Sequence, residues 1–489
     1  MNDKIFRVIC VLLAGFLWTS ALDLECVYQG CYCDYDSINC GDMDLTAMPE
    51  ITGDSTAFMP QVSLDRNQIS RISAGSLIAN ISGLSVAENP VKTIDEAAFN
   101  ESLNTLQSLV FSGAAFAQIP DAVLQLRNLI SLSVSNTNIT TWNDSGMAKL
   151  GSGIQILILD TVGLTTWPTW LQVYSRLLQL TISGSSISSI PDNAFDLSAT
   201  SLRELSLNNN NLVTVPKALA NLTELIKLSL AQNRIANITW LPQLSKLTSL
   251  SLNDNRISDS VQLSTALRSY GSTLNEFNIH DNLLTSIPDT PLLTQLTTLD
   301  FTHNHISDPN SGSVSSAVIV LKLDYNRLRT IPRVLKTINS KYIGVALSYN
   351  SIFTIQGIDF PNSTTNVDLG GNFIQELSDT SFPVNSSIMY LYLYNNPLTK
   401  VSPLAFRNLP QLRDLNLRNT RLTRLPLAIA SLTGLWSIDV TGSTYLVCTC
   451  EEKSLEAVIR AVYDIFGDCG PTSLYTFYNE FSPMCSSDK

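Results

Sequence analysis

The residues with the clearest capacity for chemistry are three histidines that lie close together in the sequence, His280, His303 and His305. Asp281 and Asp300 lie beside them, and imidazole with carboxylate is a ligand set that Zn²⁺ accepts. However, the sequence contains no H-E-x-x-H pattern, phosphate-binding loop or G-x-S-x-G elbow, the motifs that accompany hydrolysis or group transfer. We therefore interpret the histidines as solvated and expect no metal, no cofactor and no enzymatic activity.

Whether these side chains meet depends on the elements that carry them, and those elements repeat. Residues 202–212, LRELSLNNNNL, are followed by LIKLSLAQNRI at 225–235, with leucine or isoleucine and asparagine in the same places. The frame L-x-x-L-x-L-x-x-N-x-L can be laid along the chain about 17 times, at spacings of roughly 22 to 27 residues. The residues in its asparagine place are Asn67, Asn89, Ala114, Thr137, Val162, Ser185, Asn210, Asn233, Asn255, Asn282, Asn304, Asn326, Asn350, Asn372, Asn396, Thr420 and Ser443.

Each part of this frame has a physical role. The central L-x-L predicts a short strand with two apolar side chains inward and one residue outward. The asparagine amide can bond backbone groups of adjacent coils that no strand pairing satisfies. One coil cannot bury its apolar face alone, so stacked coils share one core. The sequence therefore predicts an α/β repeat solenoid, a curved stack with a parallel β-sheet on its concave side.

The two ends of the chain differ from the repeats. Lys4 and Arg7, an apolar run from Val8 to Trp18 and small residues up to Ala21 read as a secretory signal peptide over residues 1–21. Of the nine cysteines, one lies in this segment and the other eight form a group of four at each end. In an exported chain, even-numbered clusters favour disulfides. A zinc site is the weaker alternative, because paired C-x-x-C spacing is lacking.

With CVYQGCYCDYDSINC before the repeats and CTCEEKSLEAVIRAVYDIFGDC after them, the chain resembles the extracellular leucine-rich repeat proteins with cysteine-rich caps. The resemblance implies a horseshoe of about 17 repeats. It also implies an N-terminal cap at 22–58, an array at 59–445 and a C-terminal cap at 446–489. Counting alone leaves three pairings for each cluster. The resemblance implies the pairs Cys26–Cys33, Cys31–Cys40, Cys448–Cys469 and Cys450–Cys485.

The C-terminal cap also carries a helical pattern of its own. Apolar residues recur at helical spacing after the second C-x-C cysteine, which predicts one amphipathic helix. Those residues are Leu455, Val458, Ile459, Val462, Ile465 and Phe466.

The residues that point outward from the expected strands differ in size and polarity along the chain. They are mostly small up to about residue 251, as at Ser206 and Ser229, and then become aromatic or charged. Tyrosine and arginine are enriched at binding hot spots, so we expect this part of the concave face to bind a ligand. The alternative is a solvated face with cross-strand pairs such as Asp300 beside Lys322. The candidate ligand-binding residues are His280, Asp281, Asp300, His303, Lys322, Asp324, Tyr325, Tyr349, Asp368, Tyr390, Tyr392, Tyr394, Arg413 and Arg418.

Four successive repeats lack asparagine, with Ala114, Thr137, Val162 and Ser185 in its place. Tryptophans follow the expected strands there, at positions 142, 167 and 170. We favour an irregular array in which these rings fill the gap. The alternative is a second, exposed contact surface.

Sequons mark candidate glycosylation sites, and none uses an asparagine of the repeat frame. They begin at Asn80, Asn100, Asn138, Asn143, Asn221, Asn237, Asn362 and Asn385.

Composition narrows the function. With a net charge of −12, the chain is unsuited to nucleic acid or another polyanion as its main partner. A membrane span needs roughly 18 or more apolar residues, and none follows Cys485, so we expect no span. We predict a secreted, extracellular, non-enzymatic recognition protein that binds a protein or glycan. The alternatives are a structural matrix component and the ectodomain or truncated form of a receptor.

Overall fold

A computed structural model describes residues 26–34, 36–53, 59–244 and 246–485. The expected signal peptide at 1–21 lies outside the described residues. The chain forms two compact units, Met1–Gly153 and Ile154–Lys489. The division falls within the group of repeats that lack the frame asparagine.

The first unit is a ladder of strands with short helices beside it. Its first two strands pair antiparallel, and the other strand pairs described in the unit are parallel, including the separate pair β4–β6. The strands are β1 (Tyr32–Cys33), β2 (Ser37–Asn39), β3 (Gln61–Ser63), β4 (Arg71–Ile72), β5 (Gly83–Ala87), β6 (Thr93–Ile94), β7 (Ser108–Ser112) and β8 (Ser131–Ser135). The helices are η1 (Asn100–Ser102), α1 (Asp121–Leu124) and α2 (Asp144–Leu150).

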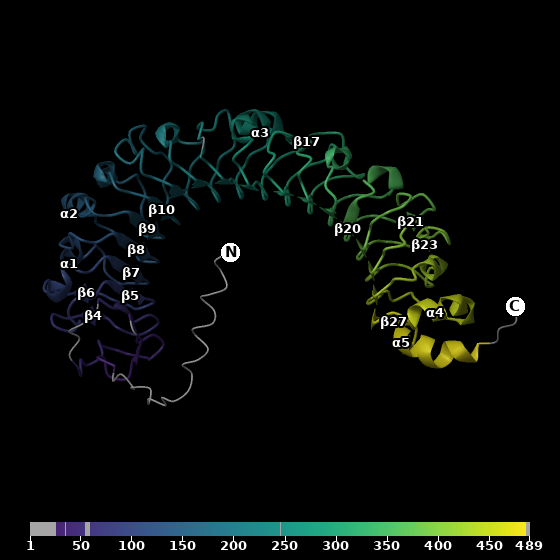
Figure 1. The fold of residues 1–489 in the computed structure, drawn as a ribbon, viewed down its shortest axis with the longest axis horizontal. Helices are drawn as coiled ribbons and strands as arrows, with labels where there is room; N and C mark the ends of the chain where they lie inside the picture. The colour runs from purple at the N-terminus through teal and green to yellow at the C-terminus, as the bar shows by residue number, and fades with distance from the viewer. Residues whose placement is uncertain (1–25, 35, 54–58, 245, 486–489) are drawn as a thin grey trace, which may run out of the picture. The chain divides into compact units, whose positions relative to one another are not determined.

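The second unit continues the same architecture over more repeats. Neighbouring strands of its main sheet pair in parallel, and these strands line the inner side of its curve (Figure 1). We call the outward-pointing residues of these strands and of the turns that follow them the concave face. The strands are β9 (Ile156–Asp160), β10 (Gln179–Ser183), β11 (Glu204–Ser206), β12 (Lys227–Ser229), β13 (Ser249–Ser251), β14 (Glu276–Asn278), β16 (Thr298–Asp300), β18 (Val320–Lys322), β19 (Ile343–Ala346), β20 (Thr364–Asp368), β22 (Tyr390–Tyr392), β24 (Asp414–Asn416), β25 (Ser437–Asp439) and β26 (Asp464–Phe466).

The other side of the second unit carries short helices and two-residue strands (Figure 1). The strand pairs are β15 (Asp289–Thr290) with β17 (Ser313–Val314), β21 (Glu376–Leu377) with β23 (Lys400–Val401), and β27 (Asp468–Cys469) with β28 (Thr472–Ser473) in the cap. The helices are η2 (Thr169–Val173), η3 (Lys217–Asn221), α3 (Ser260–Leu267), η4 (Arg268–Tyr270), η5 (Arg333–Thr337), η6 (Gly357–Asp359), η7 (Leu427–Ser431), η8 (Cys450–Leu455), α4 (Glu456–Ile459), α5 (Leu474–Thr476), η9 (Phe477–Phe481) and η10 (Ser482–Met484). Among the described residues, no helix is long and apolar enough to cross a membrane.

Burial follows the predicted alternation. In β10, Leu180 and Ile182 are buried, while Thr181 between them is half-exposed on the concave face. The register places Leu180 beside Leu157 of β9 and Leu205 of β11, so leucines of successive coils stack into one continuous core. The structure confirms the expected repeat solenoid with a parallel sheet.

The frame asparagines make the expected bonds. The Nδ2 atom of Asn210 donates to the carbonyl oxygens of Ile182 (2.8 Å) and Leu207 (3.2 Å), and its Oδ1 atom accepts from the N–H of Ile187 (3.2 Å). The amide thus bonds its own coil and the preceding one. Leaving such buried groups unbonded costs about 1–3 kcal/mol each, which explains why asparagine recurs.

The repeats without asparagine use weaker substitutes. The N–H of Ala114 donates to the Thr137 hydroxyl (3.1 Å), which itself donates to the Ser135 carbonyl (2.8 Å). Trp167 and Trp170 are buried, and Trp167 packs edge-on against Phe195. Tryptophans 167 and 170 therefore fill space in the array, as favoured from the sequence, while Trp142 is half-exposed.

Disulfides secure both ends of the described chain. They join Cys26 to Cys33, Cys31 to Cys40, Cys448 to Cys469 and Cys450 to Cys485, the same pairs that the resemblance implied.

The expected single cap helix is wrong in its second half. Helix α4 ends at Ile459, and Ile465 and Phe466 lie on strand β26 instead. This strand pairs with β25, with Ile465 beside Ile438. Adding one more strand to the sheet satisfies backbone groups that a longer helix would leave bare.

Candidate functional site

The candidate site in the second unit is built on a backbone feature that recurs in each repeat. The residue directly before the frame asparagine adopts a left-handed conformation, with φ of 54° at Asp281 and His303, 53° at Tyr325 and 52° at Tyr349. Large side chains rarely adopt this conformation, which costs of order 1 kcal/mol or more. The frame asparagine that follows each residue anchors the turn, so these side chains stand in a row along the edge of the sheet.

Aromatic rings in that row stack on one another. The rings of His303 and Tyr325 lie 4.3 Å apart, and those of Tyr325 and Tyr349 lie 4.5 Å apart with an angle of only 9° between them. Tyr394 continues the series, with its ring edge-on to Tyr349 at 6.4 Å. Tyr325 and Tyr349 are 45% and 40% exposed, although aromatic side chains usually bury most of their area. We call His303, Tyr325, Tyr349 and Tyr394 the aromatic row.

Two glycines allow Tyr349 and Tyr394 to meet across an intervening coil. A Cβ atom on Gly371 would lie 2.6 Å from the Tyr349 ring, and one on Gly370 would lie 2.1 Å from the Tyr394 ring. The coil between the two tyrosines therefore leaves room for both rings. Asn395 completes the contact, because its Nδ2 atom lies 3.4 Å from the Tyr349 hydroxyl.

Carboxylates lie beside the aromatic row. The Tyr394 hydroxyl donates to Asp368 (3.3 Å), and Asp324 accepts from the N–H (2.8 Å) and hydroxyl (2.6 Å) of Ser348. Burial, together with the negative charge of Asp324, raises the pKa of Asp368. Burial and the charge of Asp368 raise the pKa of Tyr394 to about 12. Tyr394 is therefore a neutral hydrogen-bonding group at physiological pH.

The expected cross-strand pair is present. Lys322 donates to Asp300 at 3.1 Å. Burial alone would raise the pKa of Asp300, but hydrogen bonds from Thr302 and this contact outweigh burial and lower it. At these two positions the structure agrees with the alternative of a solvated, self-paired sheet face.

The remaining candidates occupy the adjacent strands. Tyr390 and Tyr392 point outward from β22 on either side of buried Leu391, and Tyr392 pairs in register with Asp368. Arg413 and Arg418 flank β24 and are exposed. The concave face thus continues past the aromatic row as a half-exposed surface of tyrosine, aspartate and arginine.

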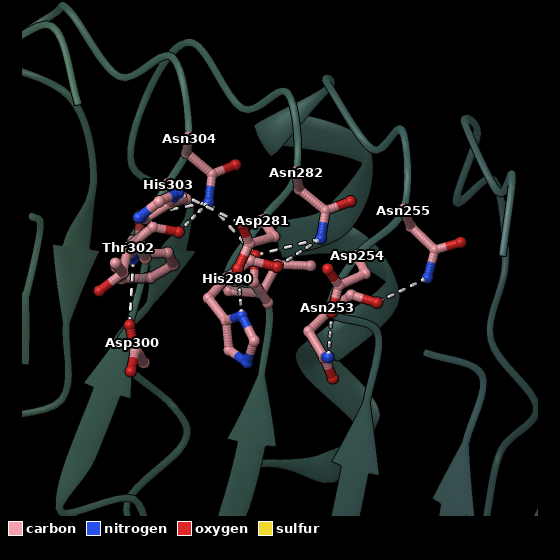
Figure 2. Close-up of polar contacts among 12 residues, drawn as sticks. Asn253, Asp254, Asn255, His280, Asp281, Asn282, Asp300, Thr302, His303 and Asn304 are labelled. Carbon is pink, nitrogen blue, oxygen red and sulfur yellow. Dashed lines mark hydrogen bonds and ion pairs between the residues drawn. The ribbon is translucent and has the colours of Figure 1, made fainter. Parts of the chain in front are cut away.

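Two of the three histidines lie beside the Asp281 carboxylate, and the third does not. The Nδ1 atom of His280 lies 2.7 Å from Asp281, and that of His303 lies 3.4 Å from the same carboxylate (Figure 2). Ligand atoms of Asp254, His280 and Asp281 lie within 4.8 Å of one another, and Asp254 was not among the residues predicted from the sequence. His305 follows the frame asparagine, outside this group, and Asp300 pairs with Lys322 instead.

Sequence reasoning also missed Asn395 and the glycine pair 370–371. The signal was present in the frame, because Asp254 and Asn395 occupy the same place, one residue before the asparagine, as Tyr325 and Tyr349. Reading that place separately from the strand residues would have identified His303, Tyr325 and Tyr349, but not Tyr394, which lies one residue earlier in its repeat.

The sequon asparagines are all exposed, as glycan attachment requires. The Asn143 side chain additionally caps helix α2 through its oxygen, which accepts from the N–H of Gly146. Attachment through the nitrogen is compatible with this cap.

Comparisons with known proteins agree with the fold. The family described as "Leucine rich repeat" matches residues 175–235, 200–257, 362–422 and 386–443. Human "Leucine-rich repeats and immunoglobulin-like domains protein 2" is 32% identical over 148 residues, 30% of this chain and 13% of that protein. "Keratocan" of Danio rerio is 31% identical over 173 residues, 34% of this chain and 49% of that protein. The chain thus spans less than half the length of these relatives.

Solved structures show the same architecture at low identity. A TLR13–ssRNA13 complex has a TM-score of 0.61 and 19% identity, covering 89% of this chain and 73% of that one. YopM from Yersinia enterocolitica WA-314 has a TM-score of 0.54 and 15% identity, covering 89% and 88%. The coils, frame asparagines and terminal disulfides define a capped repeat solenoid. The chain carries leucine-rich repeats in the matched stretches and folds as a leucine-rich repeat solenoid.

Proposed function

We infer that this chain is a secreted, non-enzymatic recognition protein that binds an extracellular protein or glycan on the concave face of its second unit. The aromatic row carries the proposal. Stacked rings with hydroxyl groups at their tips offer apolar area and hydrogen bonds together, and tyrosines lose little conformational entropy on binding. Holding Tyr325 and Tyr349 exposed in a left-handed conformation costs stability, which a binding role would justify.

The chemistry of the surroundings supports a protein or glycan rather than a polyanion. Asp324 and Asp368 lie beside the aromatic row, and the chain carries a net charge of −12. A cationic or hydroxyl-rich ligand fits such a surface, because aromatic faces and carboxylates both attract cations and both accept hydrogen bonds. Disulfides at both ends support an oxidising, extracellular location.

As part of this proposal, the chain has a signal peptide, two cysteine-rich caps around the repeat array, and glycans on its sequons. Eight exposed sequons are consistent with export. The alternatives are a structural matrix component and part of a longer receptor. The relative named for immunoglobulin-like domains extends well beyond the matched region, which is 13% of its length.

The test is a binding screen of the secreted chain against extracellular proteins and glycans. The double variant Tyr325→Ala/Tyr349→Ala should bind the main partner at least about tenfold more weakly. Two hot-spot side chains together contribute about 2 kcal/mol or more to the binding free energy. Tyr342→Ala is the control, because Tyr342 is somewhat more exposed than Tyr325 and Tyr349 but lies outside the aromatic row. A partner that binds the double variant and the control equally well would place recognition elsewhere.

A further inference from the structure

We propose that Asp254, His280 and Asp281 form a binding site for a Zn²⁺ ion at the ends of strands β13 and β14, with the His303 imidazole beside it as a further ligand. The proposal concerns the metal alone and stands whether or not the concave face binds a partner.

Convergence of mixed ligands is the first argument. One ligand atom from each of Asp254, His280 and Asp281 lies within 4.8 Å of the others. Zinc bonds to nitrogen and oxygen at about 2.0–2.2 Å, so tetrahedral ligand atoms are roughly 3.3–3.6 Å apart. Closing the site therefore requires side-chain movements of about 1 Å at exposed or half-exposed positions. His303 lies outside this group of three, but its Nδ1 atom approaches the Oδ1 atom of Asp281 from the next coil at 3.4 Å, so a rotation of its side chain would bring it to the ion as a fourth ligand.

Backbone contacts fix the turns that carry the ligands. The N–H of Asp254 donates to the His280 carbonyl (3.1 Å), and that of Asp281 donates to the Thr302 carbonyl (2.9 Å). Buried frame asparagines at 255, 282 and 304 follow directly and bond each coil to its neighbour (Figure 2). The ligand-bearing backbone is therefore rigid before any ion arrives.

One ligand already has an orienting partner. Asn253 donates through Nδ2 to the Oδ2 atom of Asp254 at 2.7 Å. Such contacts hold ligating carboxylates in place and strengthen metal sites.

The ligand chemistry selects the ion. Two carboxylates and two imidazoles suit Zn²⁺ and similar transition metals, whereas Ca²⁺ and Mg²⁺ prefer oxygen ligands alone. Among the described residues, neither Asp254 nor Asp281 forms an ion pair with a lysine or arginine, and Lys322 pairs with Asp300 instead. A divalent ion would balance their two negative charges.

The site also adjoins the aromatic row. The His303 ring stacks on Tyr325 at 4.3 Å, so an ion bound through His303 would fix the first ring of the row. With four protein ligands the ion would be fully coordinated, as in structural zinc sites.

The test is isothermal titration of ZnCl₂ into the full disulfide-bonded chain, made without a polyhistidine tag and treated with a chelator first. His280→Ala and Asp281→Asn should each weaken zinc binding at least tenfold. Asparagine is well suited to the left-handed position of Asp281, so this variant removes a ligand while keeping the turn. His305→Ala is the matched control and should bind zinc like the unchanged chain.

Three results would overturn the proposal. The first is no measurable zinc binding by the unchanged chain. The second is equal loss in His305→Ala and His280→Ala. The third is displacement of zinc by excess Ca²⁺. Thermal unfolding of each variant in chelator, compared with the unchanged chain, separates ligand loss from loss of folding, and Asp281→Asn should match the unchanged chain there.

Discussion

At the scale of single residues, the ionised carboxylate of Asp368 lowers the stability of the folded chain. It is half-buried beside Tyr394, and burial and the charge of Asp324 raise its pKa. When the folded-state pKa is raised, the ionised form is disfavoured in the folded chain. The penalty is absent in acid, where the carboxyl is protonated in both states, and it develops as pH rises through the folded-state pKa.

Asp368→Asn should therefore stabilise the chain at neutral pH, by up to about 1 kcal/mol after allowance for partial exposure, and make no difference near about pH 3. Urea unfolding at both pH values measures the effect. Asp300→Asn is the matched control with the opposite sign, because the pKa of Asp300 is lowered by its hydrogen bonds. That variant should destabilise the chain at neutral pH and lose its effect in acid. A less stable Asp368→Asn at neutral pH would show that the bonds from Gly370 and Tyr394 outweigh burial.

At the scale of elements, the coil that carries Gly370 and Gly371 sets the geometry of the aromatic row. A methyl group on Gly370 would collide with the Tyr394 ring, which would have to rotate away from Tyr349 and Asp368. Gly370→Ala should weaken binding of the main partner about tenfold, while the free energy of unfolding falls by no more than about 1–3 kcal/mol, the usual cost of overpacking.

Gly344→Ala provides the control for this prediction. Gly344 lies on neighbouring strand β19, where a new Cβ would have ordinary contacts of 3.8 Å or more. Both properties should be unchanged in that variant. Equal affinity of Gly370→Ala and Gly344→Ala for the partner would mean that the contact between Tyr349 and Tyr394 is not part of the binding surface.

The elements also show what a sequence can predict. Strands, frame asparagines and buried leucines follow from local periodicity, because each repeat must bury the same face, and the structure confirms them. The cap helix was overextended because Ile465 and Phe466 fit a helical pattern, yet pairing with β25 decided their structure. The aromatic row was only partly visible, because its contacts join residues whose distance depends on the two glycines between them.

At the scale of the whole molecule, the terminal coils of a stack have a neighbour on one side only. Local unfolding can therefore begin at the ends, and the caps limit how far it extends into the stack. Each coil contacts mainly its neighbours, and the stability of such arrays is close to a sum of repeat and interface contributions. In the C-terminal cap, the Cys450–Cys485 bond spans 35 residues of sequence. Within the cap, Glu452 accepts from the N–H of Thr449 at 2.9 Å and also pairs with Arg424 of the preceding repeat.

Replacing both cysteines, as Cys450→Ser/Cys485→Ser, should destabilise the cap by about 3–4 kcal/mol through the freed loop. Hydrogen exchange should then accelerate most in β26 and β25, less in β24, and little by α3, because loosening passes from one coil to the next. The reciprocal variant Cys31→Ser/Cys40→Ser is the control, and its effect should be greatest in β2 and β3. Uniform acceleration across the second unit after loss of the Cys450–Cys485 bond would instead mean that its coils unfold as one cooperative block. In that case, loss of the bond would destabilise the aromatic row as much as it destabilises the coils next to the cap.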